Sequence, residues 1–227
     1  MDLHEGQVPA ASAQLAAEVD RLQMLENELR LTQDAVVERL SIAAEFRDDE
    51  TARHVQRMSR YTALLARRAG ATPARAEEVR IASVMHDVGK IGIPDSILLK
   101  PGKLTPEERR IMEQHSEIGY RILSGSRSEL LTLAAQIAWT HHERFDGNGY
   151  PRRIAGDDIP VEGRMAAIAD VFDALTSNKV YKKASPVPQA VEIMREGRGS
   201  HFDGALLDLF LDSMDEVVRI KERYADR

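Results

Sequence analysis

The sequence predicts an all-α protein, in which a helical bundle follows an extended, coiled-coil-like N-terminal helix. Apolar residues recur at steps of three and four along most of the chain, which is the spacing of one helix face. No run of alternating β-branched residues indicates a sheet. Aromatic residues make up only 5% of the chain, so we expect an aliphatic core.

The N-terminal region is expected to contain a disordered tail followed by one long helix. Residues 1–11 are polar and include Gly6 and Pro9, whereas 12–40 contains neither residue type. An apolar stripe with near-heptad spacing follows this helix: Leu15, Val19, Leu22, Leu25, Leu29, Val36 and Leu40. The stripe fits either a parallel homodimer seam or packing against the chain's own domain. Its extent upstream of the first chemical motif favours the homodimer.

The remaining segment, 41–227, is expected to form one domain of further helices. Gly70 should end one helix and Pro73 should open the next. Thr105-Pro106-Glu107-Glu108 combines an N-cap, a first-position proline and first-turn acids, which together are typical of a helix start. Later helices are expected at 130–142, 164–175, 186–194 and 206–218, with a loop at 147–151.

Composition excludes several classes of protein. The net charge of −6 lacks the basic surplus of a nucleic-acid binder. No apolar run approaches the roughly 18 residues of a membrane span, and no basic region precedes an apolar run as in a secretory signal. The absence of cysteine excludes disulfides and thiolate-bound zinc. A cytoplasmic protein is expected by default.

Several of the seven histidines lie beside carboxylates. Glu50 and His54 are four residues apart, so they share a helix face. His86-Asp87 ends an apolar helix, where a charged aspartate is costly unless it is paired or bound to a metal. Nitrogen and carboxylate ligands without sulfur suit manganese, iron or zinc, and leave magnesium open.

Two further positions extend this set. His141 and His142 are neighbours, and adjacent helical side chains diverge by about 100°, so the two rings suit two different metals better than one. Asp170 lies within another apolar helix. Taken singly, each residue has an ordinary interpretation: Glu50 and His54 as a solvated face, His115 as a surface or core histidine. Their joint occurrence on separate helices favours a metal centre.

Two long motifs resemble those of a known family. His86-Asp87-Val88-Gly89-Lys90-Ile91-Gly92-Ile93-Pro94 matches the His-Asp signature of the HD metal-dependent phosphohydrolases, and its longer form is similar to the HD-GYP branch. The segment 141–151 resembles that branch's second signature and contains Gly149-Tyr150-Pro151. With the shorter segments 169–176 and 199–203, the resemblance covers about residues 39–210. It implies an HD-type helical bundle and a phosphodiesterase that hydrolyses the bacterial second messenger cyclic di-GMP.

The resemblance also implies the site residues and cofactors. It implies two or three divalent metal ions, most often iron or manganese, with Glu50 accompanying the third. A metal-bridged hydroxide would attack the phosphodiester to give pGpG, GMP or both, and His86, Asp87 and Lys90 would be catalytic. The implied metal ligands are Glu50, His54, His86, Asp87, His115, His141, His142 and Asp170.

The resemblance further implies residues that contact the substrate. Lys90 would bind phosphate or stabilise the leaving group, and Lys179 and Lys182 would bind the substrate. The family often has Arg-Pro-Tyr where this chain has Lys179-Val180-Tyr181, and a lysine lacks the bidentate fork of arginine. Tyr150 would offer a stacking surface.

Two further acidic residues, Asp173 and Asp203, are candidates for structural roles. Asp173, one turn after Asp170, either supports the site or is an ordinary helical acid. Asp203, with His201, is expected to hold the C-terminal helix in place by hydrogen bonds.

Two alternative functions fit parts of the same pattern. An HD hydrolase of another nucleotide would share the His-Asp core, but the Gly149-Tyr150-Pro151 segment would be unexpected. A catalytically silent domain could sense cyclic di-GMP or dock onto a GGDEF-type partner, but such domains usually lack metal ligands that this chain retains. The N-terminal helix suggests input from a sensory or receiver domain.

Overall fold

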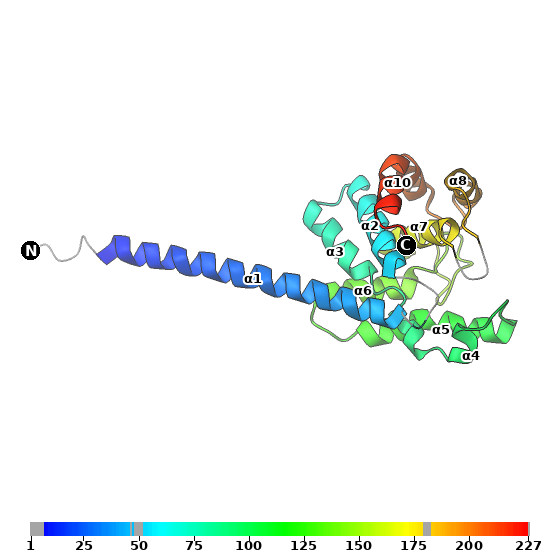
Figure 1. Cartoon of the computed structure of the whole chain (residues 1–227), viewed down its shortest axis with the longest axis horizontal. Helices are drawn as coiled ribbons and strands as arrows, with labels where there is room; N and C mark the ends of the chain where they lie inside the picture. Colours follow the sequence, from blue (N-terminus) through cyan, green and yellow to red (C-terminus); the bar gives the residue numbers. More distant parts are fainter. Residues whose placement is uncertain (1–6, 46, 48–51, 179–182, 227) are drawn as a thin grey trace, which may run out of the picture. The chain divides into compact units, whose positions relative to one another are not determined.

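The computed structural model describes residues 7–45, 47, 52–178 and 183–226, and it confirms the all-α prediction (Figure 1). Among these residues the only β pairing is an isolated bridge between Arg198 and Phe202. No described helix is both long enough and apolar enough to cross a bilayer. The α-helices and two short 3-10 helices are α1 (Gln7–Glu45), α2 (Ala52–Arg68), α3 (Pro73–Ser83), η1 (Val88–Gly92), α4 (Asp95–Leu98), α5 (Pro106–Leu123), α6 (Glu129–Thr140), η2 (Gly156–Asp158), α7 (Val161–Thr176), α8 (Val187–Glu196), α9 (Gly204–Leu211) and α10 (Met214–Arg223).

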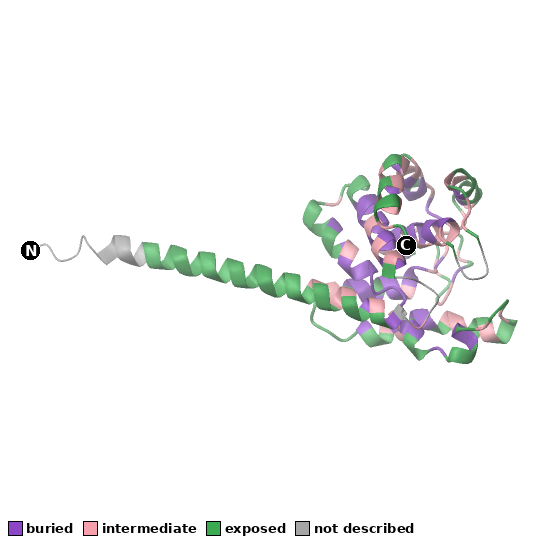
Figure 2. Ribbon diagram, in the orientation of Figure 1, coloured by how far each residue is buried: buried purple, intermediate pink, exposed green. Residues whose placement is uncertain are grey.

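The chain divides into two compact units, Met1–Val37 and Glu38–Arg227. The described part of the first unit belongs to α1, whose side chains from Ala13 onward are mostly exposed (Figure 2). Residues 7–11 of the predicted tail are helical, and residues 1–6 lie outside the described part of the chain. The division into 1–11, 12–40 and 41–227 stays a prediction.

The second unit is a bundle built around α2. This helix packs against α3, α7, α9 and α10, while α5 packs against η1 and α6. Tyr61 of α2 lies edge-on to Phe172 of α7 and Phe210 of α9, with ring centroids 5.5 and 6.2 Å apart. These rings are fully buried, as are most apolar side chains of α2, so α2 forms the central wall of the core.

The helix starts predicted at Pro73 and Thr105 are confirmed, whereas α7 begins at Val161 instead of 164 and two predicted helix ends are wrong. Thr105 and Glu108 form a reciprocal capping box, and Thr72 caps the helix that Pro73 opens. The helix expected at 130–142 stops at Thr140. The helix expected at 206–218 is interrupted, because the amide and hydroxyl of Ser213 donate to the carbonyls of Phe210 and Leu209 and so close α9.

Close contact between η1 and α5 depends on Gly89. A Cβ on Gly89 would overlap the carbonyl oxygen of His115 and the amide nitrogen of Gly119. Both of these atoms are backbone, so they cannot move aside as a flexible side chain would. The glycine that follows the His-Asp pair therefore allows the turn carrying Asp87 to lie directly on α5.

We predict that Gly89→Ala lowers the free energy of unfolding by about 2–4 kcal/mol, because the added methyl group forces η1 away from α5. Gly125→Ala is the matched control: Gly125 has φ +84° and no atom within 4 Å of its would-be Cβ, so only about 1 kcal/mol of backbone strain is expected. Urea denaturation of both variants measures the difference. Equal losses of stability would contradict the packing argument.

Candidate metal centre

Asp87 lies at the centre of a buried polar cluster. The chain leaves α3 after Ser83 and turns through hydrogen bonds from the amides of Met85, His86 and Val88 to carbonyls three residues earlier. This turn brings His86 and Asp87 inward, where Asp87 is only 5% exposed. A buried carboxylate is costly unless positive charge or hydrogen-bond donors surround it.

Four side chains surround the Asp87 carboxylate. Its Oδ1 lies 3.1 Å from Nε2 of His115 and 3.4 Å from Nε2 of His141. Its Oδ2 lies 3.3 Å from Nε2 of His86 and 2.8 Å from Nζ of Lys90. The predicted catalytic residues His86, Asp87 and Lys90 therefore meet at the Asp87 carboxylate.

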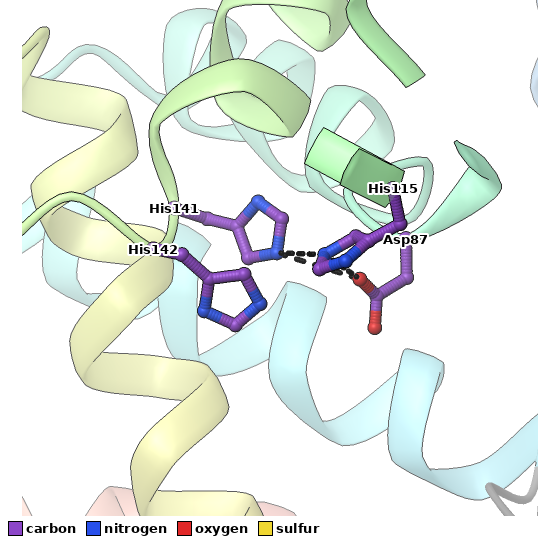
Figure 3. A group of neighbouring side chains, drawn as sticks. All are labelled: Asp87, His115, His141 and His142. Atoms are coloured by element: carbon purple, nitrogen blue, oxygen red, sulfur yellow. Dashed lines mark hydrogen bonds and ion pairs between the residues drawn. The ribbon is translucent and has the colours of Figure 1, made fainter. Parts of the chain in front are cut away.

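The first group with metal-ligand geometry comprises Asp87, His115, His141 and His142, which can each offer one ligand atom within 4.8 Å of the others. Figure 3 shows these side chains converging from separate segments. His141 is the C-cap of α6, and the His141 and His142 ring centroids lie 4.0 Å apart. The expectation that the two rings serve different metals is not supported by this placement, because both rings offer a ligand atom to the same group.

The second group comprises His54 of α2, His86 of the turn and Asp170 of α7. Nε2 of His54 lies 3.6 Å from Oδ1 of Asp170. Since His86 also contacts Asp87, the two groups adjoin at the His-Asp pair. Glu50, the remaining ligand implied by the resemblance, lies outside the described residues, as do Lys179 and Lys182.

Three histidine rings present Nε2 to the cluster and are oriented by a hydrogen bond at Nδ1. Nδ1 of His86 lies 3.0 Å from the carbonyl of Ser83, and Nδ1 of His115 lies 2.7 Å from that of Met112. Nδ1 of His141 is similarly placed at 3.1 Å from the Ala138 carbonyl. A carbonyl oxygen only accepts hydrogen bonds, so Nδ1 carries the proton and Nε2 offers its lone pair, as in metal-binding histidines.

The electrostatics of the cluster suit a divalent cation. Burial, reinforced by His141 and His115, lowers the pKa of His142 well below its ordinary value, and burial likewise lowers that of His141. Burial alone would raise the pKa of Asp87, but Lys90 and His86 hold it well below its usual range. Oδ1 of Asp87 is buried and makes no hydrogen bond to a described residue. Neutral imidazoles beside an ionised carboxylate form the nitrogen and oxygen donor set that binds divalent metals.

Asp173 supports the site by contacting His54 and is not an ordinary exposed helical acid. Its Oδ2 lies 2.8 Å from Nδ1 of His54, and its two oxygens accept hydrogen bonds of 2.6 and 2.9 Å from Arg57. Arg57 is 1% exposed and also donates to the carbonyl of Tyr224. This clamp fixes the His54 ring and ties α2 to α7 and to the end of α10.

The sequence analysis did not identify Arg57. The available signal was a charged residue inside the apolar stripe of α2, beside Val55 and Met58, one turn after His54. A buried arginine in such a stripe needs a carboxylate partner from another helix. Asp173 is that partner.

The loop at 141–151 packs against the histidines. The Tyr150 ring stacks on His142, with centroids 4.7 Å apart, and burial raises the pKa of its hydroxyl. A Cβ on Gly149 would overlap the backbone at His142, Glu143 and Arg144. Glu143, which the sequence analysis also missed, is buried and accepts a hydrogen bond of 2.7 Å from the Arg152 amide, closing the loop.

Asp203 connects the start of α9 to α7. Asp203 caps α9 by accepting from the amides of Ala205 and Leu206, and it pairs with Arg164 at 2.6 Å. Asp203 thus fixes the C-terminal region as expected. His201 participates through its carbonyl, which accepts from the Phe145 amide, while its ring stacks on Phe202.

Comparison with known proteins identifies the family. A profile described as the HD domain matches residues 24–206. The chain belongs to the HD domain family. A cyclic di-GMP phosphodiesterase of Vibrio cholerae is 42% identical over 92% of this chain, and one of Thermotoga maritima is 44% identical over 84%. These relatives confirm the predicted membership of the HD-GYP family.

Not every relative is named for cyclic di-GMP. A 3'3'-cGAMP-specific phosphodiesterase 2 of Vibrio cholerae is 45% identical over 88% of this chain. The chain spans 45%, 38% and 52% of the lengths of these three relatives. The HD domain of the L. monocytogenes phosphodiesterase PgpH, solved with cyclic-di-AMP, has the same fold: the TM-score is 0.58 at 18% identity, over 83% of this chain and 98% of that one.

We predict that Asp173→Asn weakens divalent-metal binding by about tenfold or more, because His54 loses the charged partner that orients it. Competition with a chromogenic chelator measures the affinity for manganese(II), and circular dichroism checks the fold. Asp208→Asn is the control, since Asp208 also pairs with an arginine but does so on the surface. Unchanged manganese affinity in folded Asp173→Asn would exclude the supporting role.

Proposed function

We propose that the chain is a metal-dependent phosphodiesterase that hydrolyses cyclic di-GMP. The observation that carries the proposal is the buried cluster at Asp87, in which neutral histidines and carboxylates from α2, α5, α7 and the ends of α3 and α6 converge. Relatives named cyclic di-GMP phosphodiesterases support the choice of substrate. Cytoplasmic action on this second messenger, to give pGpG or GMP, belongs to the same proposal.

The side chains divide into two roles. His86, Asp87, His115, His141 and His142, with His54 and Asp170, would hold two divalent ions, iron or manganese by the donor set; Glu50 would accompany a third. When bound, such ions supply Lewis acidity and acidify water at the phosphate. Lys90, at 2.8 Å from Asp87, provides a cation at this centre that can pair with a phosphodiester oxygen. Tyr150, Lys179 and Lys182 are proposed to contact the rest of the substrate.

The first experiment is hydrolysis of a nucleotide panel by protein loaded anaerobically with iron(II) or manganese(II). The panel contains cyclic di-GMP, 3'3'-cGAMP, cyclic di-AMP and mononucleotides. Preferred turnover of cyclic di-GMP supports the proposal, and the ratio of pGpG to GMP identifies the product. Preference for 3'3'-cGAMP would instead match the specificity for which the Vibrio cholerae 3'3'-cGAMP-specific phosphodiesterase 2 is named. Metal binding without turnover of any compound would favour a sensor or partner-docking domain.

We predict that Asp87→Asn lowers kcat for cyclic di-GMP at least about a thousandfold, because it removes the shared carboxylate of the cluster. Metal content by plasma mass spectrometry should fall in parallel. Asp95→Asn is a suitable control, since this nearby acid lies on the surface and pairs with Arg47. Turnover within a few-fold of the unsubstituted protein would rule out the proposed centre.

The first unit is proposed to mediate homodimerisation. Leu15, Leu22, Leu29 and Val36 are seven residues apart and exposed along α1, as a parallel coiled-coil seam requires. A sensory or receiver domain, or a GGDEF-type partner, would act through this helix.

We predict that Leu22→Glu with Leu29→Glu converts a dimer to a monomer in sedimentation-velocity experiments at micromolar concentration, because charge enters the apolar seam. Leu31→Glu is the control: Leu31 is similarly exposed, at 65% against 57% and 59%, but lies off the stripe. A monomeric unsubstituted chain, or a dimer unaffected by the double substitution, would contradict this arrangement.

A further inference from the structure

A cavity of about 380 Å³ lies between α2, α3 and α10, on residues that the metal centre does not use. Five arginines, two glutamates and Tyr224 contribute to its lining. We propose that this cavity binds a small phosphorylated ligand, of mononucleotide size or smaller. The proposal stands on the cavity's own residues and is independent of the proposed hydrolysis.

The positive charge of the cavity exceeds its negative charge. Of its two glutamates, Glu77 already accepts from Arg80 at 2.8 Å, and Glu216 pairs with Arg68, which lies outside the lining. Three other lining arginines, Arg67, Arg219 and Arg223, have no ion pair with a described residue. This local surplus occurs in a chain whose net charge is −6.

Helix dipoles do not account for the whole surplus. They favour cations in the last turns of α2 and α10, which explains Arg67 and Arg223 individually. Arg60 and Arg219 lie away from these last turns but line the same cavity. Arg219 and Arg223 are also four residues apart on α10, where like charges destabilise a helix. An anion between them would remove this repulsion.

Part of the cavity is ordered before any ligand binds. The guanidinium carbon of Arg60 lies 4.1 Å from the centre of the Tyr224 ring, and its Nη1 donates to the Gln56 carbonyl at 2.9 Å. A stacked, hydrogen-bonded arginine loses less freedom on binding than a free one. Arginine's planar fork matches the oxygens of a phosphate group, so phosphate is the ligand chemistry that this lining fits.

The volume limits the size of the ligand. Small-molecule binding pockets have volumes of about 300–1,000 Å³. The cavity is near this lower end, so it suits a mononucleotide better than a whole cyclic dinucleotide. Inorganic pyrophosphate and GMP share the phosphate chemistry and differ in the base. Comparing them separates simple phosphate recognition from nucleotide recognition.

Isothermal titration calorimetry of the metal-free 227-residue chain with pyrophosphate and with GMP tests the proposal. We expect one saturable site per chain that weakens as salt rises, with the double variant Arg67→Gln/Arg219→Gln binding at least about tenfold more weakly. Arg127→Gln, at an exposed loop arginine outside the cavity, should bind as tightly as the unsubstituted chain. Tighter binding of GMP than of pyrophosphate would identify a nucleotide site, and equal binding a phosphate site.

Thermal unfolding without ligand provides a second readout. If the arginines are held for a ligand, Arg219→Gln should leave Tm unchanged or raise it, because a like-charge contact is removed. A clear fall in Tm would instead indicate that Arg219 stabilises the fold, and would overturn the proposal. Three other results would also overturn the proposal. They are equal binding by the double variant, no saturable binding of pyrophosphate or GMP, and binding of a polyglutamate peptide when neither compound binds.

Discussion

The burial of one carboxylate, that of Asp87, organises the second unit of this protein. Asp87 is almost without solvent contact, yet two histidines approach one of its oxygens while His86 and Lys90 approach the other. An isolated buried carboxylate would be strongly unfavourable, so the helices that carry these partners must meet at one point. The end of α3, the short η1 and the contact with α5 through Gly89 all follow from that requirement.

A second buried charge pair stabilises the surroundings of the first. Arg57 and Asp173 connect α2, α7 and the carbonyl of Tyr224 while holding the His54 ring. Removing one partner of such a pair commonly costs about 3–5 kcal/mol, because the other charge is left buried alone. Stability and metal-site geometry therefore depend on the same residues, which explains why charged side chains occur inside an otherwise aliphatic core.

The sequence was sufficient for the parts of this arrangement that local chemistry determines. The helix start at Pro73 and the cap at Thr105 depend on neighbouring residues only, and the His-Asp motif identified the turn at the centre. The end of α9 was not predictable, because apolar residues recur at helical spacing past Leu211, at Met214 and Val217, while the helix stops. Arg57 was missed for a related reason: its partner Asp173 lies 116 residues away, and only the tertiary fold brings the two together.

The central claim is that the cluster at Asp87 holds divalent metal ions. Anomalous diffraction from crystals of manganese-loaded protein, recorded on both sides of the manganese absorption edge, tests it most directly. The account predicts one peak within coordination distance of Asp87, His115, His141 and His142, and a second beside His54, His86 and Asp170. Absence of peaks at both groups in fully loaded crystals, or ordered manganese only elsewhere on the chain, would contradict it.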